Sequence, residues 1–275
     1  MDIKLDDIQE NVVQDSKFNW KKFFLIILSI VFCVFLIVIY SRYKATSDLK
    51  VNEYKVTDSN LPDSFHGVKL VHFSDVYFGN TIDINYLEKL VSNINDLKPD
   101  IVVFTGDFTD KSIDNDLKSK VISFLSSINS TIGKYSIKGD IDDSNVYNEI
   151  FMSSGFIDIS DNHTNIYYNG NEAISIGNTD FNSELFSILL MHKPDLIDEY
   201  SNHFNLILAG HSLNGQINLP FFKKLFLKDG CKKYYSGYYD YNGTPFYVSN
   251  GLGTTSFKFR FNNTPSINLY RLTKY

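Results

Sequence analysis

The sequence contains little arginine, little cysteine and no excess of positive charge. Only three of its 26 basic residues are arginine, so most of its positive charge is carried by lysine, which does not bind phosphate in the bidentate manner of a guanidinium group. The net charge of −6 gives no electrostatic reason to expect a nucleic-acid partner, and we expect none. The two cysteines, Cys33 and Cys231, cannot form a disulfide within the globular part, because Cys33 lies in a long apolar run.

This apolar run extends from Phe23 to Tyr40 and contains 18 residues without a charge. At roughly 1.5 Å per residue, a helix of this length crosses most of the hydrocarbon core of a bilayer. The run is apolar on every face, which argues against a buried helix of a soluble core. No small-residue cleavage site follows it, since Ser41-Arg42-Tyr43-Lys44 comes next. We therefore expect a single transmembrane anchor at residues 23–40, preceded by a tail at residues 1–22.

The chain after this run predicts one globular domain. Residues 41–60 are polar and predict a linker, and residues 61–275 contain no internal repeat. Helical patterns at 84–97 and 117–128 alternate with apolar runs, which is typical of a βαβαβ arrangement. The half after Ile157 alternates short strands with Asn-Gly turns, which favours a second, largely β layer. The strands expected to precede polar loops are Val68–Phe73, Ile101–Thr105, Tyr135–Lys138, Ile188–Met191 and Asn205–Ala209.

A short polar signature follows each of these five strands, where sites of such sheets gather. The signatures are Ser74-Asp75-Val76-Tyr77, Gly106-Asp107-Phe108-Thr109-Asp110, Gly139-Asp140-Ile141-Asp142, Met191-His192-Lys193-Pro194-Asp195 and Gly210-His211-Ser212-Leu213. In order, they resemble the D-x-H, GDxxD, GNH[DE], lone-His and GHxH motifs of the calcineurin-like metallophosphoesterase superfamily. The segment Phe246–Thr254 and the later Arg260-Phe261 resemble the membrane-anchored bacterial branch of that superfamily.

The resemblance implies an α/β fold, a metallophosphoesterase-type β-sandwich flanked by helices in four layers (α/β/β/α) and preceded by one transmembrane helix. In the superfamily pattern, two metal ions share one bridging Asp. The residues that match the second ion's ligands are Asp107, Asp140, His192 and His211, a complete set with a carboxylate in place of an amide. The residues that match the first ion's ligands are Asp75, Tyr77, Asp107 and Leu213, which lack both imidazoles. We therefore expect about one divalent ion of the Mn, Zn or Fe class, rather than two.

The catalytic position has also changed, because Ile141 replaces the His that the superfamily uses near the leaving group, and no catalytic residue is intact. Two ions with two Asp give about +2, whereas one ion with Asp75, Asp107 and Asp140 gives about −1 and would repel a phosphate. Two hypotheses stay open. The domain hydrolyses a phosphoester weakly or with a single metal, or it is an inactive member that keeps the fold for binding or assembly.

The surroundings of the domain follow from the predicted anchor and from the resemblance. The anchor makes the lipid bilayer a partner and places the protein in the cell membrane as a single-pass protein. The basic residues on the two sides of the run are nearly balanced, so the positive-inside rule alone does not orient it. Resemblance to the bacterial branch implies an extracytoplasmic domain. A membrane location suggests a lipid-linked or envelope phosphoester as the substrate.

Overall fold

The computed structural model of the chain describes residues 18–110, 113–220, 222–255 and 257–275, in two units that divide between residues 39 and 40. The first unit contains helix α1 (Trp20–Ile39), which buries none of its residues and is long and apolar enough to cross a membrane. The helix covers almost all of the predicted 23–40 span. Most of the predicted tail at 1–22 lies outside the described residues.

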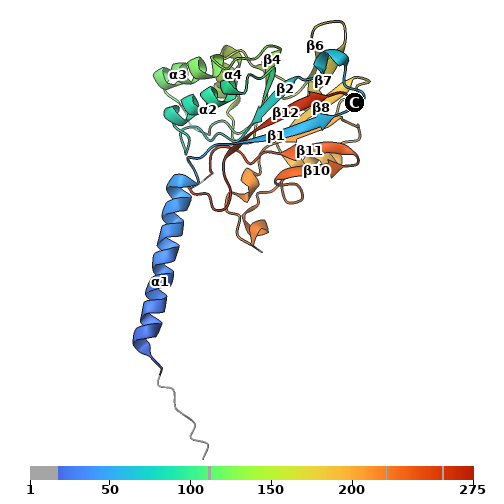
Figure 1. Ribbon diagram of the computed structural model, residues 1–275. Helices are drawn as coiled ribbons and strands as arrows, with labels where there is room; N and C mark the ends of the chain where they lie inside the picture. The colour runs from blue at the N-terminus through green and yellow to red at the C-terminus, as the bar shows by residue number, and fades with distance from the viewer. Residues whose placement is uncertain (1–17, 111–112, 221, 256) are drawn as a thin grey trace, which may run out of the picture. The chain divides into compact units, whose positions relative to one another are not determined.

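The second unit contains two six-stranded mixed sheets (Figure 1). The first sheet has the order β1-β12-β2-β3-β4-β5, in which β2 to β5 are parallel and β12 runs antiparallel to β2. Its strands are β1 (Lys50–Thr57), β2 (Lys69–Phe73), β3 (Ile101–Thr105), β4 (Gly133–Ile137), β5 (Ile157–Asp158) and β12 (Ser266–Thr273). The second sheet has the order β10-β11-β9-β8-β7-β6. Its strands are β6 (His163–Tyr167), β7 (Ala173–Gly177), β8 (Phe186–Met191), β9 (Leu206–Ala209), β10 (Gly237–Tyr241) and β11 (Thr244–Val248).

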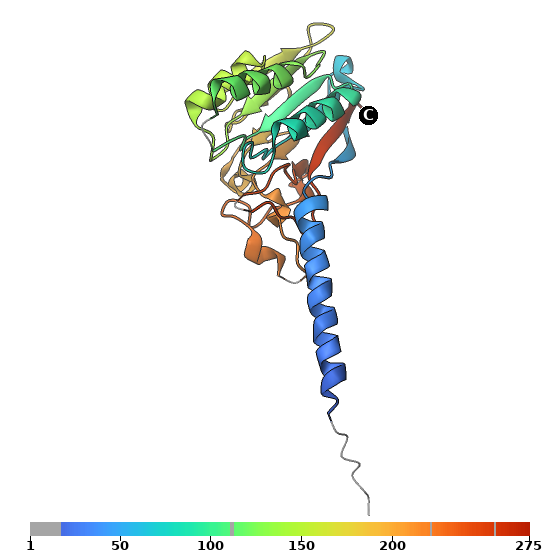
Figure 2. The same ribbon diagram turned by 90° about the vertical axis from the view of Figure 1, so that its left-hand side faces the viewer.

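Three helices connect the parallel strands of the first sheet: α2 (Ile84–Asp96), α3 (Asn115–Ser126) and α4 (Ser144–Ser153). Each begins after an aspartate whose side chain accepts a hydrogen bond from a backbone N–H of the first turn. Figure 2 shows the helices side by side across one face of the first sheet. Shorter 3-10 helices occupy Asp63–Phe65, Pro194–Glu199, Leu213–Gly215 and Lys223–Phe226, and a π-helical turn occupies Tyr40–Lys44.

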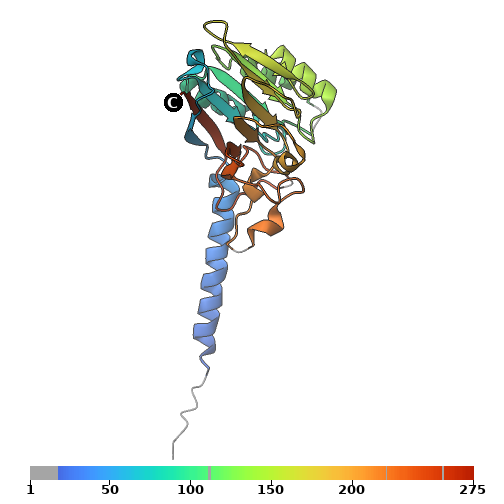
Figure 3. The ribbon, with the colours of Figure 1, turned by 90° about the vertical axis from the view of Figure 1, so that its right-hand side faces the viewer.

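The pleat of the strands divides the buried side chains among three layers. Val102 and Phe104 of β3 pack beneath the helices, whereas Ile101 and Val103 point into the core between the two sheets. A third cluster covers the outer face of the second sheet, which is seen in Figure 3, and includes Ile197 of the 3-10 helix. Strands β3 and β9 are buried at every position, and they are therefore apolar almost throughout rather than alternating.

The structure confirms the expected α/β fold of two sheets flanked by helices, and all five expected strands are present within two residues of their predicted bounds. The predicted linker at 41–60 differs, because residues 50–57 form β1 and pair in parallel with β12 along its whole length. The strand is at the edge of the sheet and alternates exposed polar residues with partly buried ones, so its composition resembles that of a linker.

Candidate metal centre

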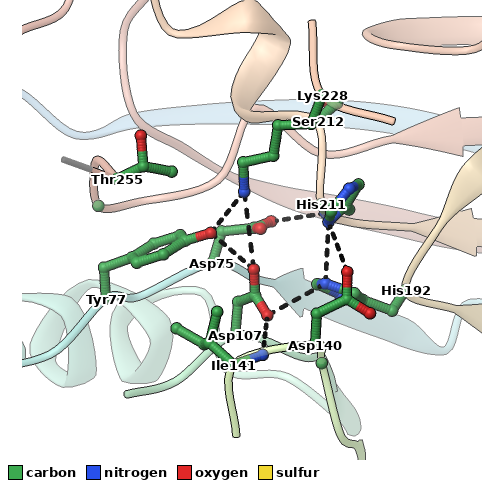
Figure 4. Close-up of polar contacts among 12 residues, drawn as sticks. Asp75, Tyr77, Asp107, Asp140, Ile141, His192, His211, Ser212, Lys228 and Thr255 are labelled. Carbon is green, nitrogen blue, oxygen red and sulfur yellow. Dashed lines mark hydrogen bonds and ion pairs between the residues drawn. The ribbon is translucent and has the colours of Figure 1, made fainter. Parts of the chain in front are cut away.

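The five predicted metal ligands come together although they are far apart in the sequence. Asp75, Asp107 and Asp140 follow β2, β3 and β4 of the first sheet, while His192 and His211 follow β8 and β9 of the second. Figure 4 shows their side chains converging from the two sheets. Ligand atoms of Asp107, His192 and His211 all lie within 4.8 Å of one another, and these three residues are buried. The loops at the carboxyl ends of both sheets thus build one site.

The residues that match the second ion's ligands form a compact group. Nε2 of His192 lies 3.1 Å from Oδ1 of Asp107 and 3.1 Å from Nδ1 of His211. Asp140 is more exposed, and its Oδ2 lies 3.8 Å from Nδ1 of His211. Its Oδ1 lies 2.9 Å from Nζ of Lys193. Two imidazole nitrogens and two carboxylate oxygens are therefore close neighbours, in a combination that suits a divalent transition metal.

Each of the two imidazoles has an inner nitrogen, which faces the other imidazole, and an outer nitrogen, which faces a carbonyl oxygen. The contact of the outer nitrogen determines whether the inner one carries a lone pair. Nδ1 of His192 lies 2.8 Å from the carbonyl oxygen of Thr105, and Nε2 of His211 lies 2.8 Å from that of Asp229. A carbonyl oxygen only accepts, so each outer nitrogen carries a proton. The inner nitrogens then face each other with two lone pairs unless a proton or a metal ion lies between them. This orientation fits a metal ion held at the inner nitrogens.

The charges of the site determine where that proton lies in the metal-free protein. Burial lowers the pKa of His192, but Asp107 more than offsets this effect and raises it to about 9. Burial, followed by the charge of His192, lowers the pKa of His211 to about 4. Although burial opposes ionisation, the contact with His192 holds the pKa of Asp107 well below its usual range. At neutral pH the inner nitrogen of His192 is therefore protonated, and a metal ion that binds there displaces this proton.

A second carboxylate holds the loop that carries Asp107. Asp142 accepts hydrogen bonds from the backbone N–H groups of Asp107, Phe108 and Gly139 at distances between 2.7 and 2.9 Å. A Cβ atom at Gly139 would lie 2.3 Å from Oδ1 of Asp107, so only glycine allows this approach of the two loops. Ile141 touches Asp107 through its backbone N–H at 3.2 Å. The acidic residue after Ile141 therefore positions Asp107, while the aliphatic side chain offers no proton.

The residues that match the first ion's ligands do not fit a metal ion. Tyr77 donates a hydrogen bond from its phenol to Oδ2 of Asp107 at 2.6 Å, and burial raises its pKa above the usual range, so it stays neutral. Leu213 is buried at the other position. Asp75 accepts hydrogen bonds through Oδ2 from the Ser74 hydroxyl and the His211 N–H. No nitrogen ligand remains at this position, and a neutral phenol is a poor oxygen ligand.

The backbone of these loops keeps an unusual conformation at the changed positions. Tyr77 and Leu213 have φ of 50° and 48°, close to the values of 53°, 63° and 67° at Asp75, Asp107 and His211. Bulky residues seldom adopt the left-handed region, and they do so where the surrounding structure imposes it. The loops that carry Tyr77 and Leu213 therefore share the left-handed backbone conformation of the residues that match metal ligands.

Sequence reasoning missed Lys228, which lies outside the five signatures. Its Nζ lies 2.5 Å from Oη of Tyr77 and 3.8 Å from Oδ2 of Asp107. Dashed lines mark both contacts in Figure 4. The predicted charge of about −1 was the signal that a compensating cation was needed. Lys228 and Lys193 add two positive charges and the Asp142 carboxylate adds one negative charge, so a one-ion site has a charge of about zero and the predicted repulsion of a phosphate does not hold.

Comparison with known proteins identifies the family. Residues 68–229 match the model of the calcineurin-like phosphoesterase family. The chain is 31% identical over 261 residues to the uncharacterized metallophosphoesterase YkuE of Bacillus subtilis, covering 85% of this chain and 88% of that protein. It is 25% identical over 240 residues to the UDP-2,3-diacylglucosamine pyrophosphatase LpxG of Chlamydia trachomatis, covering 62% and 73% of the two chains. It is 29% identical over 133 residues to a transmembrane protein with metallophosphoesterase domain of Danio rerio, covering 47% of this chain and 30% of that protein. The chain therefore belongs to the calcineurin-like phosphoesterase family.

Proposed function

We propose that this protein is a membrane-anchored phosphoester hydrolase that works with a single divalent ion. The observation that carries the proposal is the buried group of Asp107, His192 and His211, with Asp140 beside it, in a family that binds divalent metals. An ion held by these four side chains would supply Lewis-acid polarisation of a phosphoryl oxygen. The two nearby lysine ammonium groups favour an anionic substrate.

The residue at the leaving-group position narrows the class of substrate. In hydrolysis a water oxygen bonds to phosphorus, and the leaving oxygen departs with the electron pair of the broken bond. Ile141 cannot donate a proton to that oxygen, so alkoxide leaving groups are disfavoured. A phosphate leaving group is stable without an added proton. We infer that the enzyme prefers diphosphate linkages over alkyl phosphoesters, in line with the activity named for the Chlamydia trachomatis relative.

An apolar surface beside the site supports a lipid-linked substrate. Phe226 and Phe257 are 39% and 74% exposed, and they line a cavity of about 230 Å³ together with Leu213 and Lys228. Lys228 thus belongs both to this cavity and to the metal centre. An acyl chain or other apolar group in the cavity would leave its phosphate near the ion. Helix α1 supports the same location, since we propose that it anchors the domain in the cell membrane on the extracytoplasmic side.

The second candidate is an inactive member of the family that keeps the fold for binding or assembly. The observation in its favour is that Tyr77 and Lys228 lie against Asp107 and that Ile141 occupies the position of the family's proton donor. The two candidates differ in whether the remaining ligands bind an ion and turn over a substrate.

The test uses the full chain in detergent micelles, supplied with Mn²⁺ after chelation. We expect about one bound ion per chain and slow hydrolysis of bis(p-nitrophenyl) phosphate, whose aryl oxide leaves without a proton. His211→Ala should weaken Mn²⁺ binding by about 100-fold or more and abolish hydrolysis, because it removes one of two nitrogen ligands. His203→Ala, at an exposed histidine outside the signatures, is the matched control.

Two outcomes would contradict this function. Wild-type protein that binds no Mn²⁺ and hydrolyses nothing would favour the inactive candidate. Two bound ions with rapid hydrolysis of glycerophosphodiesters, which release an alkoxide, would refute both the single-ion assignment and the substrate preference.

A further inference from the structure

The Lys228 side chain lies beside two residues that match the first ion's ligands in the family pattern. Its ammonium group contacts Oη of Tyr77 at 2.5 Å and lies 3.8 Å from Oδ2 of Asp107. Tyr77 occupies the position of the first ion's imidazole and Asp107 that of the bridging carboxylate. We propose that the Lys228 ammonium replaces the first metal ion, neutralising Asp107 and binding a phosphoryl oxygen of the substrate. This inference rests on the proposed single-ion function.

The hydrogen bonds of Asp107 show how the replacement works. Oδ1 contacts His192 and the Ile141 N–H, on the side of the remaining metal ligands. Oδ2 accepts the Tyr77 hydrogen bond and faces Lys228. The carboxylate would therefore lie between a metal ion held by the two histidines and an ammonium group that belongs to the chain. Tyr77 completes the link, because its hydroxyl accepts from Lys228 while it donates to Asp107.

The ammonium group remains accessible to a ligand. The Lys228 side chain is 29% exposed, whereas that of Asp107 is 1% exposed. Lys228 also lines a second cavity, of about 370 Å³, with Tyr77, Asn80, Asp110, Ile141 and Thr255, in which the Asp110 carboxylate accepts a hydrogen bond from Asn80. An ammonium group has three donors, and the contact with Tyr77 uses one of them. A phosphoryl oxygen in this cavity can therefore meet a positive charge without a first metal ion.

Asp75, which also matches a ligand of the first ion, has a carboxylate oxygen without a hydrogen-bond donor among the described residues. This oxygen, Oδ1, is buried. A buried carboxylate oxygen without a partner is costly, and a neighbouring positive charge reduces this cost. Asp75 and Asp107 together would attract a metal ion, but the two missing imidazoles leave the chain's own cation as the available group.

The test restores the missing ligands with and without the lysine. In the full chain in micelles, Tyr77→His with Leu213→His should bind about one Mn²⁺, because Lys228 still occupies the position. Adding Lys228→Met should raise the stoichiometry to about two. Adding Lys224→Met instead, at an exposed lysine of the same loop, should leave it at about one. Two ions bound by the double variant with Lys228 present would overturn the proposal. So would one ion bound by the triple variant with Lys228→Met, provided that it is folded.

A second measurement does not depend on restored ligands. Inorganic phosphate, titrated in metal-free buffer, should bind Lys228→Met about tenfold more weakly than wild-type protein, as expected for one lost ion pair. Lys224→Met should match wild type. Equal phosphate affinity in all three proteins would overturn the proposal. Failure of wild type to bind Mn²⁺ would instead refute the proposed function, and the phosphate titration would still decide the role of Lys228.

Discussion

His192 links the metal centre to pH through a single proton. Its pKa of about 9 in the metal-free protein lies above the unfolded value of about 6.5. Mn²⁺ must displace this proton, so its affinity should rise with pH, by about tenfold per unit between pH 7 and 9. Calorimetry across this range in two buffers of different ionisation enthalpy measures the proton released. An affinity that is flat between pH 7 and 9 would contradict a protonated His192.

The same shift predicts how the stability of the metal-free domain changes with pH. A raised pKa contributes stability that is fully present below about pH 6.5 and is lost as the pH rises through about 9. The free energy of unfolding should therefore fall over this window in chelated protein, and urea denaturation at several pH values measures it. Bound metal should remove this dependence, because the proton is then absent from the folded state.

Arg260 is a buried charge that holds the loop between β11 and β12. Its guanidinium donates to the carbonyl oxygens of Asn250 and Gly253, and the Gly253 N–H in turn donates to the carbonyl oxygen of Asp75 at 2.7 Å. Arg260→Met leaves these carbonyls without donors and should lower the free energy of unfolding by about 3 kcal/mol. Arg271→Met, at an exposed arginine paired with Glu53, should cost less than about 1 kcal/mol. Equal losses of unfolding free energy for the two variants in urea denaturation would contradict this role of Arg260.

At the scale of elements, strand β1 is the part of the fold that is hardest to recognise from the composition of the sequence. It pairs with β12 along its whole length, and the Tyr54 ring stacks on Tyr270 with ring centroids 5.5 Å apart. A chain that begins at Leu61, the predicted domain boundary, would expose the edge of β12 and lose this packing. We expect it to aggregate, whereas a chain that begins at Asp48 should be soluble and monomeric. Size-exclusion chromatography of the two compares them directly, and equal behaviour would show that β1 is dispensable.

The two sheets supply different kinds of candidate metal ligand. The loops after β2, β3 and β4 supply carboxylates, and the loops after β8 and β9 supply imidazoles, so neither sheet alone contains a metal site. The core between the sheets must therefore align the two edges before any ligand set exists. A substitution deep in this core is expected to weaken metal binding as well as stability.

At the scale of the whole molecule, the proposed membrane anchor is helix α1. All of its residues are exposed, and its length and apolar composition suit a bilayer. The full chain should stay with the membrane fraction at high salt and should need detergent for release. The chain that begins at Asp48 should appear in the soluble fraction under the same conditions. Release of the full chain by salt alone would contradict the anchor.

Several features of this protein follow from its sequence because they depend on local chemistry. The uncharged run at 23–40 predicts an apolar helix from the hydrophobicity of consecutive residues alone. The five strands and the signatures after them are equally local, since a buried strand is a short apolar run and a loop is polar. The proximity of His192 and His211 could be predicted because the carboxyl ends of neighbouring parallel strands share an edge. That Asp107 joins them followed from the resemblance to the family motifs, since it comes after a strand of the other sheet.

Other features were decided only by the tertiary structure, since they depend on which surfaces meet. The strand at 50–57 is recognisable only beside β12, because an edge strand buries alternate residues and looks polar in sequence. The position of Lys228 beside Asp107 joins residues that are 121 positions apart, and no spacing rule predicts such a contact. Lys228 offsets the negative charge predicted for the site, because the charge depends on the sum of groups brought together by the fold. The sequence thus determined which candidate ligand side chains are available, and the fold decided which charged groups lie beside them.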